Sequence, residues 1–189
     1  MRPPCSLTLL SALCLLLSGA AKAQRLPANV VPENYKLMID PEIAAHKFSG
    51  KETITVRATR PTSEILLNSL DLEITAAELT AGGSTQPAQV GYDRSNEVIR
   101  LSFQRSVPAG LASIRLKWTG RLTEGLRGLY LSKSPRREYA VTQFEGTYAR
   151  MMFPCFDEPA FKATFDLSVM ADKGDTAISN GRIIRDEPS

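Results

Sequence analysis

The sequence VTQFEGTYARMMFPCFDEPAFKATF, residues 141–165, carries the densest local signals in the chain. It opens with the alternation of a strand, two prolines then bracket a short loop, and an aromatic-rich strand follows. The part that reads GTYARMM has room for one short turn of helix at most. This stretch therefore predicts a strand, a rigid loop and a second strand, with almost no helix.

The same two-residue alternation extends over most of the chain. NYKLMID places Tyr35, Leu37 and Ile39 on one face, and ETITVRAT places Ile54 and Val56 on one face. Further strands are predicted at EILLN (64–68), EITAAELTA (73–81), NEVIRLSF (96–103), ASIRLKWTG (112–120), REYAVTQFE (137–145) and FKATFDLSVMAD (161–172). Turn-forming residues separate them, among them AGGSTQPAQ and YDRSN. The pattern predicts an all-β fold, an antiparallel saddle or sandwich of many short strands.

The last fifteen residues, DTAISNGRIIRDEPS, look like half of a hairpin. Asn180-Gly181 is a strong tight-turn signal, and the residues after such a turn should pair back onto the strand before it. A chain that stopped here would leave an unpaired sheet edge. We therefore expect the sequence to be a truncated piece of a longer chain, with the final strands of the domain missing.

Residues 1–23 have the features of an export signal. One early positive charge, Arg2, precedes an apolar run from Leu7 to Leu17, and Ala21-Lys22-Ala23 gives the small-x-small pattern of a cleavage site. The apolar run is shorter than the roughly 20 residues that span a bilayer. We predict a signal peptide at 1–23 and one β-domain at 24–189, exported to the periplasm or secreted, with no membrane anchor after cleavage. An uncleaved anchor is the alternative.

Charge and cysteine content narrow the class of protein. The chain has 23 basic and 20 acidic residues, and loss of Arg2 and Lys22 with the signal leaves a near-neutral domain. Without a basic stripe, a nucleic-acid partner is not expected. Cys5 and Cys14 lie in the signal, so Cys155 stands alone and no internal disulfide framework is predicted. Cys155 is either buried or pairs with a cysteine outside this sequence, and we favour burial.

No catalytic or metal-binding set is apparent in the sequence. The single histidine, His46, lies in a loop between two predicted strands, whereas a zinc site normally needs three protein ligands. There is no G-x-S-x-G motif for a serine nucleophile, and AGGSTQ lacks the G-K-[ST] ending of a phosphate-binding loop. We therefore expect no catalytic residue and no metal ligand in this chain, which argues against a self-sufficient enzyme.

Two pairs of polar residues remain as candidates for a site. Gln143 and Glu145 are two apart, so in a strand they share a face, and a carboxylate beside an amide suits a primary ammonium group. Glu145 would supply the countercharge and Gln143 would bond the adjoining backbone. On spacing alone, an ordinary solvated strand face is the simpler interpretation. For Asp157 and Glu158, inside the proline-bracketed loop, we predict a structural role as acceptors of backbone amides.

At these residues the sequence resembles the M1 family of zinc aminopeptidases, the aminopeptidase N type. TQFEGTYARMMFPCFDEPAFKATF follows the family pattern T-Q-F-E-x-x-x-A-R-x-x-F-P-C-[FW]-D-E-P-x-x-K-A-x-F. Shorter pieces, VPENYKLMIDP, FSGKETITV, EILLNSLDL and LKWTGRL…LRGLYLSK, match in the family's order, so the likeness spans nearly all of 24–189. The resemblance implies an N-terminal β-domain that packs on a thermolysin-like catalytic domain. By match, Gln143 would line the pocket for the first substrate side chain and Glu145 would bind the free N-terminal ammonium.

This chain departs from the family pattern in two absent motifs and in one residue of the Q-x-E block. The G-[AG]-M-E-N segment and the H-E-x-x-H helix are absent, so the resemblance implies that zinc is bound by a catalytic domain in cis, outside this sequence. The segment alone is then expected to be inactive, although the whole protein would release N-terminal amino acids from peptides. The family often has proline where this chain has Gly146. The alternative function is a non-catalytic β-sandwich module for binding or structure.

Overall fold

The computed structural model describes residues 25–187, so the predicted signal peptide at 1–23 lies outside the described residues. Eleven strands and two single-turn 3-10 helices lie within that range: β1 (Val30–Glu42), η2 (Ile43–Ala45), β2 (Lys47–Ala58), β3 (Thr62–Asn68), β4 (Glu73–Ala81), β5 (Ser84–Pro87), β6 (Gln89–Asp93), β7 (Val98–Val107), β8 (Gly110–Arg121), β9 (Gly128–Lys133), β10 (Glu138–Gln143), η3 (Ala149–Met151) and β11 (Thr164–Val169). The predicted all-β class is confirmed, and η3 is the short turn expected within GTYARMM.

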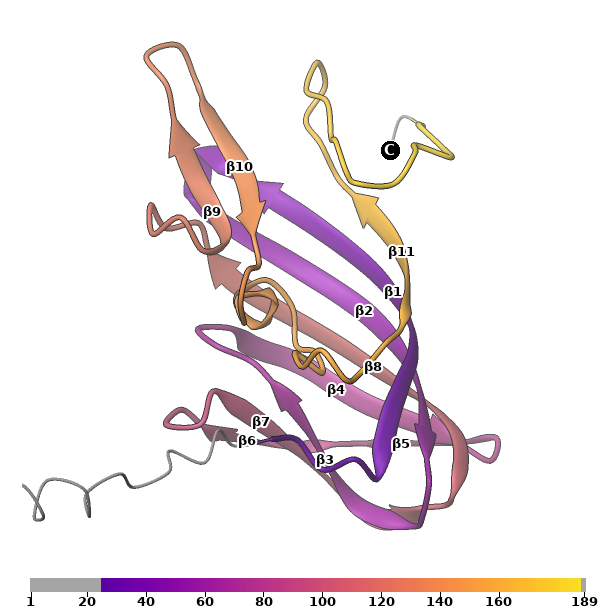
Figure 1. The fold of residues 1–189 in the computed structure, drawn as a ribbon. Coiled ribbons are helices and arrows are strands. Elements are labelled where there is room, and N and C mark those ends of the chain that lie inside the picture. The colour runs from indigo at the N-terminus through magenta and orange to yellow at the C-terminus, as the bar shows by residue number, and fades with distance from the viewer. Residues whose placement is uncertain (1–24, 188–189) are drawn as a thin grey trace, which may run out of the picture.

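A six-stranded sheet, ordered β11-β1-β2-β8-β4-β5, forms the body of the molecule (Figure 1). A three-stranded sheet, β3-β7-β6, and the β9–β10 hairpin complete the fold. Neighbouring strands are antiparallel, as predicted, except that β11 pairs in parallel with β1, with Tyr35 opposite Phe165. The chain reaches β11 through a long segment that crosses the sheet, and a parallel neighbour requires such a crossover.

One face of the six-stranded sheet carries the core. The residues predicted to point inward are buried, including Tyr35, Leu37 and Ile39 of β1, which are at most 5% exposed. Trp118 of β8 is fully buried, and its ring explains a glycine in the neighbouring strand. A Cβ atom on Gly50 would come within 2.2 Å of the Trp118 ring, so the close packing of the indole excludes any side chain there.

Two strands occupy sequence that we had predicted as turns. AGGSTQPAQ contains β5 (Ser84–Pro87) and the first residue of β6 (Gln89–Asp93), and YDRSN contains the end of β6. β5 lies at the edge of the six-stranded sheet. An edge strand tolerates Pro87 because its missing N–H need not face a neighbouring strand. Its largely exposed residues also lack the alternation that marks a half-buried strand.

The structure corrects the end of one predicted strand and the existence of another. REYAVTQFE was expected to continue to Glu145, but β10 ends at Gln143 and Glu145 lies in the following turn. The segment 175–187, predicted as strand, forms no strand within the described residues. Ile178 and Ile184 there are 89% and 85% exposed, so no neighbouring strand covers their apolar side chains.

Glu52 is a polar exception in the core. It lies on the buried face of β2, opposite Leu37 in β1 and Leu116 in β8, and is 4% exposed. Neither of its carboxyl oxygens has a hydrogen-bond partner among the described residues. Burial raises the pKa of Glu52 well above its ordinary value, because an unpaired charge in an apolar interior is costly. The folded protein therefore favours the protonated, neutral form of this side chain.

Replacing Glu52 with leucine is expected to stabilise the fold, and more so at high pH. Because its pKa is higher in the folded than in the unfolded state, the stability linked to Glu52 is complete below the unfolded pKa and is lost as pH rises. Urea unfolding should show Glu52→Leu more stable by about 1–3 kcal/mol at pH 8, with a smaller gain at pH 5. Glu73→Leu, at an exposed position of β4, is the control, and a gain for Glu52→Leu that is independent of pH would contradict the assignment.

Candidate functional site

Gln143 and Glu145 lie together at the end of the β9–β10 hairpin. Gln143 is the last residue of β10, opposite Gly128 of β9, and both Gln143 and Glu145 are exposed. The Gln143 Oε1 atom accepts a hydrogen bond from the Glu145 backbone N–H at 2.6 Å. Since a backbone N–H can only donate, the side-chain amide of Gln143 keeps its NH₂ group for another partner. The predicted bond from Gln143 to the adjoining backbone is thus confirmed, and it joins the pair where the strand itself has ended.

Phe144 attaches the segment 143–145 to the apolar interior. It is partly buried and packs edge-on against Phe153, with ring centroids 6.3 Å apart. The peptide bond from Glu145 to Gly146 is cis. None of the ion pairs formed among residues 25–187 includes Glu145. The apolar side chain therefore points inward while an amide and an unpaired carboxylate flank it on the surface.

Gly128 lets the segment after the hairpin lie close to β9. Its φ of +66° is in the region that favours glycine, and a Cβ atom would come within 2.5 Å of the Met151 Cβ. Met151 belongs to η3, the helical turn that follows Glu145. The glycine opposite Gln143 is therefore required by the close approach of η3.

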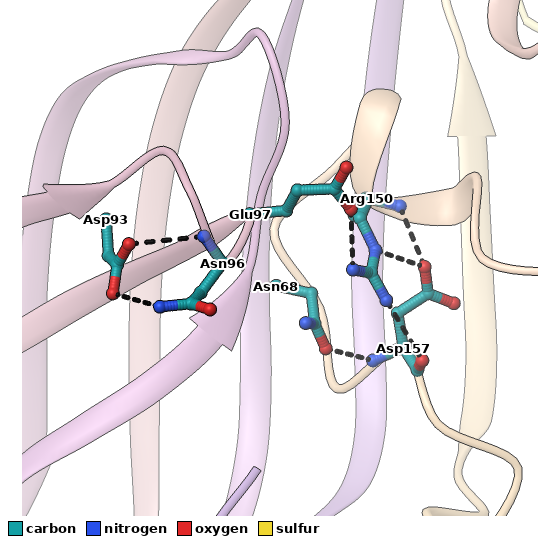
Figure 2. Close-up of polar contacts among 6 residues, drawn as sticks. All are labelled: Asn68, Asp93, Asn96, Glu97, Arg150 and Asp157. Atoms are coloured by element: carbon teal, nitrogen blue, oxygen red, sulfur yellow. Dashed lines mark hydrogen bonds and ion pairs between the residues drawn. The ribbon is translucent and has the colours of Figure 1, made fainter. Parts of the chain in front are cut away.

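Arg150 of η3 ties this region to two other parts of the chain. Its side chain is 10% exposed, and its Nε lies 3.0 Å from Asp157 Oδ2 while its Nη1 lies 2.9 Å from Glu97 Oε2 (Figure 2). Its backbone carbonyl accepts a hydrogen bond from the Leu70 N–H at 2.9 Å. The planar guanidinium thereby binds two carboxylates at once, an arrangement that fixes direction as well as distance.

Asp157 and Glu158 have the structural role that the sequence predicted. The Asp157 carboxylate accepts from the Arg150 backbone N–H at 3.4 Å as well as from the side chain, and the Asp157 N–H donates to Asn68 Oδ1 at 3.1 Å. Glu158 Oε1 accepts from the Leu26 N–H at 2.5 Å, so its backbone partner lies at the start of the domain. The Asp157 carboxylate thus holds the proline-bracketed loop against η3, and the Glu158 carboxylate holds it against the start of the domain.

The turn between β6 and β7 presents Glu97 to Arg150. The Asp93 carboxylate closes that turn, accepting from the Asn96 side chain at 2.8 Å and the Asn96 backbone at 3.2 Å (Figure 2). It also accepts from Ser95 Oγ at 2.7 Å. The hydrogen bond from the Asn96 side chain, followed by that from the Ser95 side chain, lowers the pKa of Asp93. Glu97 has a φ of 55°, and its carbonyl accepts from the Ser69 N–H at 2.8 Å. Neither Glu97 nor Asn68 was predicted from the sequence.

Two further hydrogen bonds attach the segment that runs from η3 through the proline-bracketed loop to the core face of the six-stranded sheet. Trp118 Nε1 donates to the Met152 carbonyl at 2.8 Å, and the Phe156 N–H donates to the Tyr35 hydroxyl at 3.0 Å. Cys155 is free and 4% exposed, which confirms the expected burial. Burial raises the pKa of the Cys155 thiol, so the reactive thiolate is disfavoured. These backbone contacts add to the side-chain contacts of Arg150, Asp157 and Glu158 that hold the same segment.

His46 lies on the surface and links β10 to the tip of the β1–β2 hairpin. Its Nε2 is 2.9 Å from Glu138 Oε2, and this hydrogen bond lowers the pKa of Glu138. Among residues 25–187, no three His, Cys, Asp or Glu side chains lie close enough together to hold a metal ion. The described residues therefore do not themselves provide a zinc site.

A sequence profile of the Peptidase M1 N-terminal domain matches residues 31–189. This chain belongs to the M1 aminopeptidase N-terminal domain family. It is 35% identical over 167 residues to aminopeptidase M1-D of rice, 36% identical over 171 residues to endoplasmic reticulum aminopeptidase 1 of mouse, and 31% identical over 179 residues to a puromycin-sensitive aminopeptidase of Caenorhabditis elegans. These alignments cover 86%, 85% and 91% of this chain but only 19%, 18% and 19% of the relatives. The chain therefore spans about a fifth of the length of the curated relatives it matches.

Replacing Arg150 with methionine is expected to lower the free energy of unfolding by about 3 kcal/mol, because removal of one partner leaves a largely buried carboxylate, that of Asp157, without its countercharge. Arg57→Met is the matched control. Arg57 pairs with Glu33 at 2.7 Å, but the two side chains are 54% and 38% exposed, so its loss should change stability by about 0–1 kcal/mol. Urea unfolding of both variants gives the comparison, and equal losses would show that the Arg150 contacts are not special.

Proposed function

We propose that residues 24–189 form the substrate-recognition domain of an exported, zinc-dependent M1 aminopeptidase that releases N-terminal amino acids from peptides. In this proposal Glu145 binds the free ammonium group of the substrate, and Gln143 lines the pocket for its first side chain. The observation that carries it is the geometry at the end of β10, where Gln143 is bonded to the Glu145 backbone and both polar groups are exposed.

The chemistry of this pair suits the end of a peptide. A primary ammonium has three donors and a positive charge, and a carboxylate accepts such donors in charge-assisted hydrogen bonds. The Glu145 carboxylate is available because no cation of residues 25–187 forms an ion pair with it. A peptide bond within a chain offers no ammonium, so this contact would select the first residue of a substrate.

The rigid surroundings support a role in measuring position. Phe144 is held against Phe153. Three residues separate Glu145 from η3, where Arg150 is bound by two carboxylates. Binding groups discriminate best when their supports keep them within a fraction of an ångström of the productive geometry. The recognition pair would therefore stay in place when a substrate arrives.

The reactive half of such a site would come from a catalytic domain in cis. When bound there, zinc would polarise the scissile carbonyl and activate water. The contribution of this chain would be to hold the substrate ammonium at Glu145 and to orient the first residue at Gln143. Without that second domain, the chain would not hydrolyse peptides.

Export is the proposed location because of residues 1–23. Their early Arg2, apolar run and Ala21-Lys22-Ala23 ending follow the pattern of a cleaved signal, which would give a periplasmic or secreted protein. None of the helices found among residues 25–187 has the length or apolar character needed to cross a bilayer.

The role of Glu145 can be tested in the complete enzyme. The reading frame beyond codon 189 is expected to continue into an H-E-x-x-H motif, and a stop codon there would support the non-catalytic binding module instead. In that longer protein, Glu145→Ala should weaken transition-state binding of free-amine substrates by about 2–5 kcal/mol, measured as kcat/KM, if the ammonium is desolvated in the complex. Glu42→Ala, an exposed carboxylate elsewhere, is the control. Unchanged kinetics for Glu145→Ala would remove this residue from the site.

The chain by itself is expected to have no peptidase activity. The purified 189-residue protein, incubated with an aminoacyl chromogenic substrate and zinc, should release product no faster than buffer. Turnover that is lost on Glu145→Ala would contradict this expectation and indicate a self-sufficient enzyme.

A further inference from the structure

The six-stranded sheet has a second face, opposite the core and away from Gln143 and Glu145. Alternation along the strands places four exposed cations there: Lys36, Lys51, Arg115 and Lys117. A hollow of about 660 Å³ lies over this face. Its lining residues within the described chain all belong to β11, β1, β2, β8 and β4, so the sheet itself forms its floor.

The four cations surround one residue at the centre of the hollow. Thr53 of β2 lies opposite Lys36 of β1 on one side and Arg115 of β8 on the other. Lys51 is two residues from Thr53 on the same strand, and it lies directly opposite Lys117. A group placed above the Thr53 hydroxyl would therefore be within reach of positive charge from three neighbouring strands.

This positive charge is only partly compensated. Arg115 pairs with Glu78 at 2.7 Å, but none of the ion pairs formed among residues 25–187 includes the three lysines. Asp166 lies opposite Lys36 but accepts a hydrogen bond from Asn34 Nδ2 at 3.2 Å. Like charges directly opposite each other in neighbouring strands are destabilising. The Lys51–Lys117 pair thus has a cost that an anion between the two ammonium groups would remove.

The carboxylates around the hollow restrict the kind of anion. In the cross-strand row that contains Thr53, Asp166 lies beyond Lys36 and Glu78 lies beyond Arg115. Asp40 and Glu73 lie at the two ends of a parallel row beyond Lys51 and Lys117. A long polyanion such as nucleic acid would cross this acidic rim and be repelled. A peptide with one or two carboxylates over the centre and uncharged or basic residues over the rim meets complementary charge throughout.

We propose that this face binds a short acidic segment of another polypeptide, with a carboxylate above Thr53 between Lys36, Lys51 and Lys117. Met38 and Ala76 flank Lys51 and Lys117 in the same cross-strand row and add uncharged surface for the peptide backbone. The interaction is independent of the recognition of a substrate ammonium, because it uses the opposite face of the sheet and the opposite charge.

An NMR titration of the 189-residue chain with the peptide GSEESG tests the proposal. Amide shifts are expected to change for the hollow residues of β1, β2 and β8, to weaken with added salt, and to be absent with GSQQSG. The double variant Lys51→Gln/Lys117→Gln should raise the dissociation constant at least tenfold. These residues are exposed, so the substitutions are expected to leave the fold intact.

A matched control lies in the same two strands. Lys47 and Arg121 are exposed and also directly opposite each other, but they lie outside the hollow, and Glu42 is the neighbour of Lys47 in β1. Lys47→Gln/Arg121→Gln should leave the affinity for GSEESG unchanged. Equal losses in both double variants, no binding of GSEESG, or tighter binding of a thymidine oligonucleotide with two phosphodiesters would each overturn the proposal.

Discussion

The guanidinium of Arg150, held between Asp157 and Glu97, is the contact on which the arrangement of the candidate site depends. It joins η3, the proline-bracketed loop and the β6–β7 turn, three segments that no strand pairing places side by side. The charge is largely buried, so it tolerates neither the loss of a carboxylate nor a shift that would leave one unpaired. Three residues separate Glu145 from η3, so the Arg150 contacts help to fix where Glu145 lies, together with the packing of Phe144 on Phe153.

Unlike the largely buried Arg150, the proposed recognition pair is in contact with water. Gln143 and Glu145 are exposed, and an exposed carboxylate gains little from a cation that water also solvates. The same carboxylate is worth several times more once water is excluded from around it. In the proposed function, the domain would therefore supply direction and rigidity, and the strength of the contact would depend on a second surface that closes over the substrate. Such a division suits a domain that occupies about a fifth of its relatives' length.

The sequence predicted those features that have a local cause. Tyr35, Leu37 and Ile39 alternate because one face of β1 is buried, and the Q-x-E block is read directly from residues 141–165. Contacts between distant residues were not predicted. Arg150 and Glu97 are 53 positions apart, and Glu97 reads as part of a strand until the turn formed by Asp93 is seen. Within residues 141–165, an arginine followed seven positions later by an aspartate was the one local feature that could have indicated the Arg150–Asp157 ion pair. Alternation places Glu52 on the face of Ile54 and Val56, but the predicted strand ETITVRAT began at Glu52, whereas β2 begins at Lys47 and keeps this residue inside the sheet.

The parallel pairing of β1 with β11 makes completion of the fold depend on nearly the whole chain. Asn34 and Thr164, which share a hydrogen bond across this edge, are 130 positions apart. Contacts of such long range form late, since the ends of a long loop must meet before any gain is realised. During synthesis on the ribosome, one edge of β1 would thus remain unpaired until β11 emerges. During that interval the nascent chain is exposed to mispairing, and its dependence on chaperones should be greatest then.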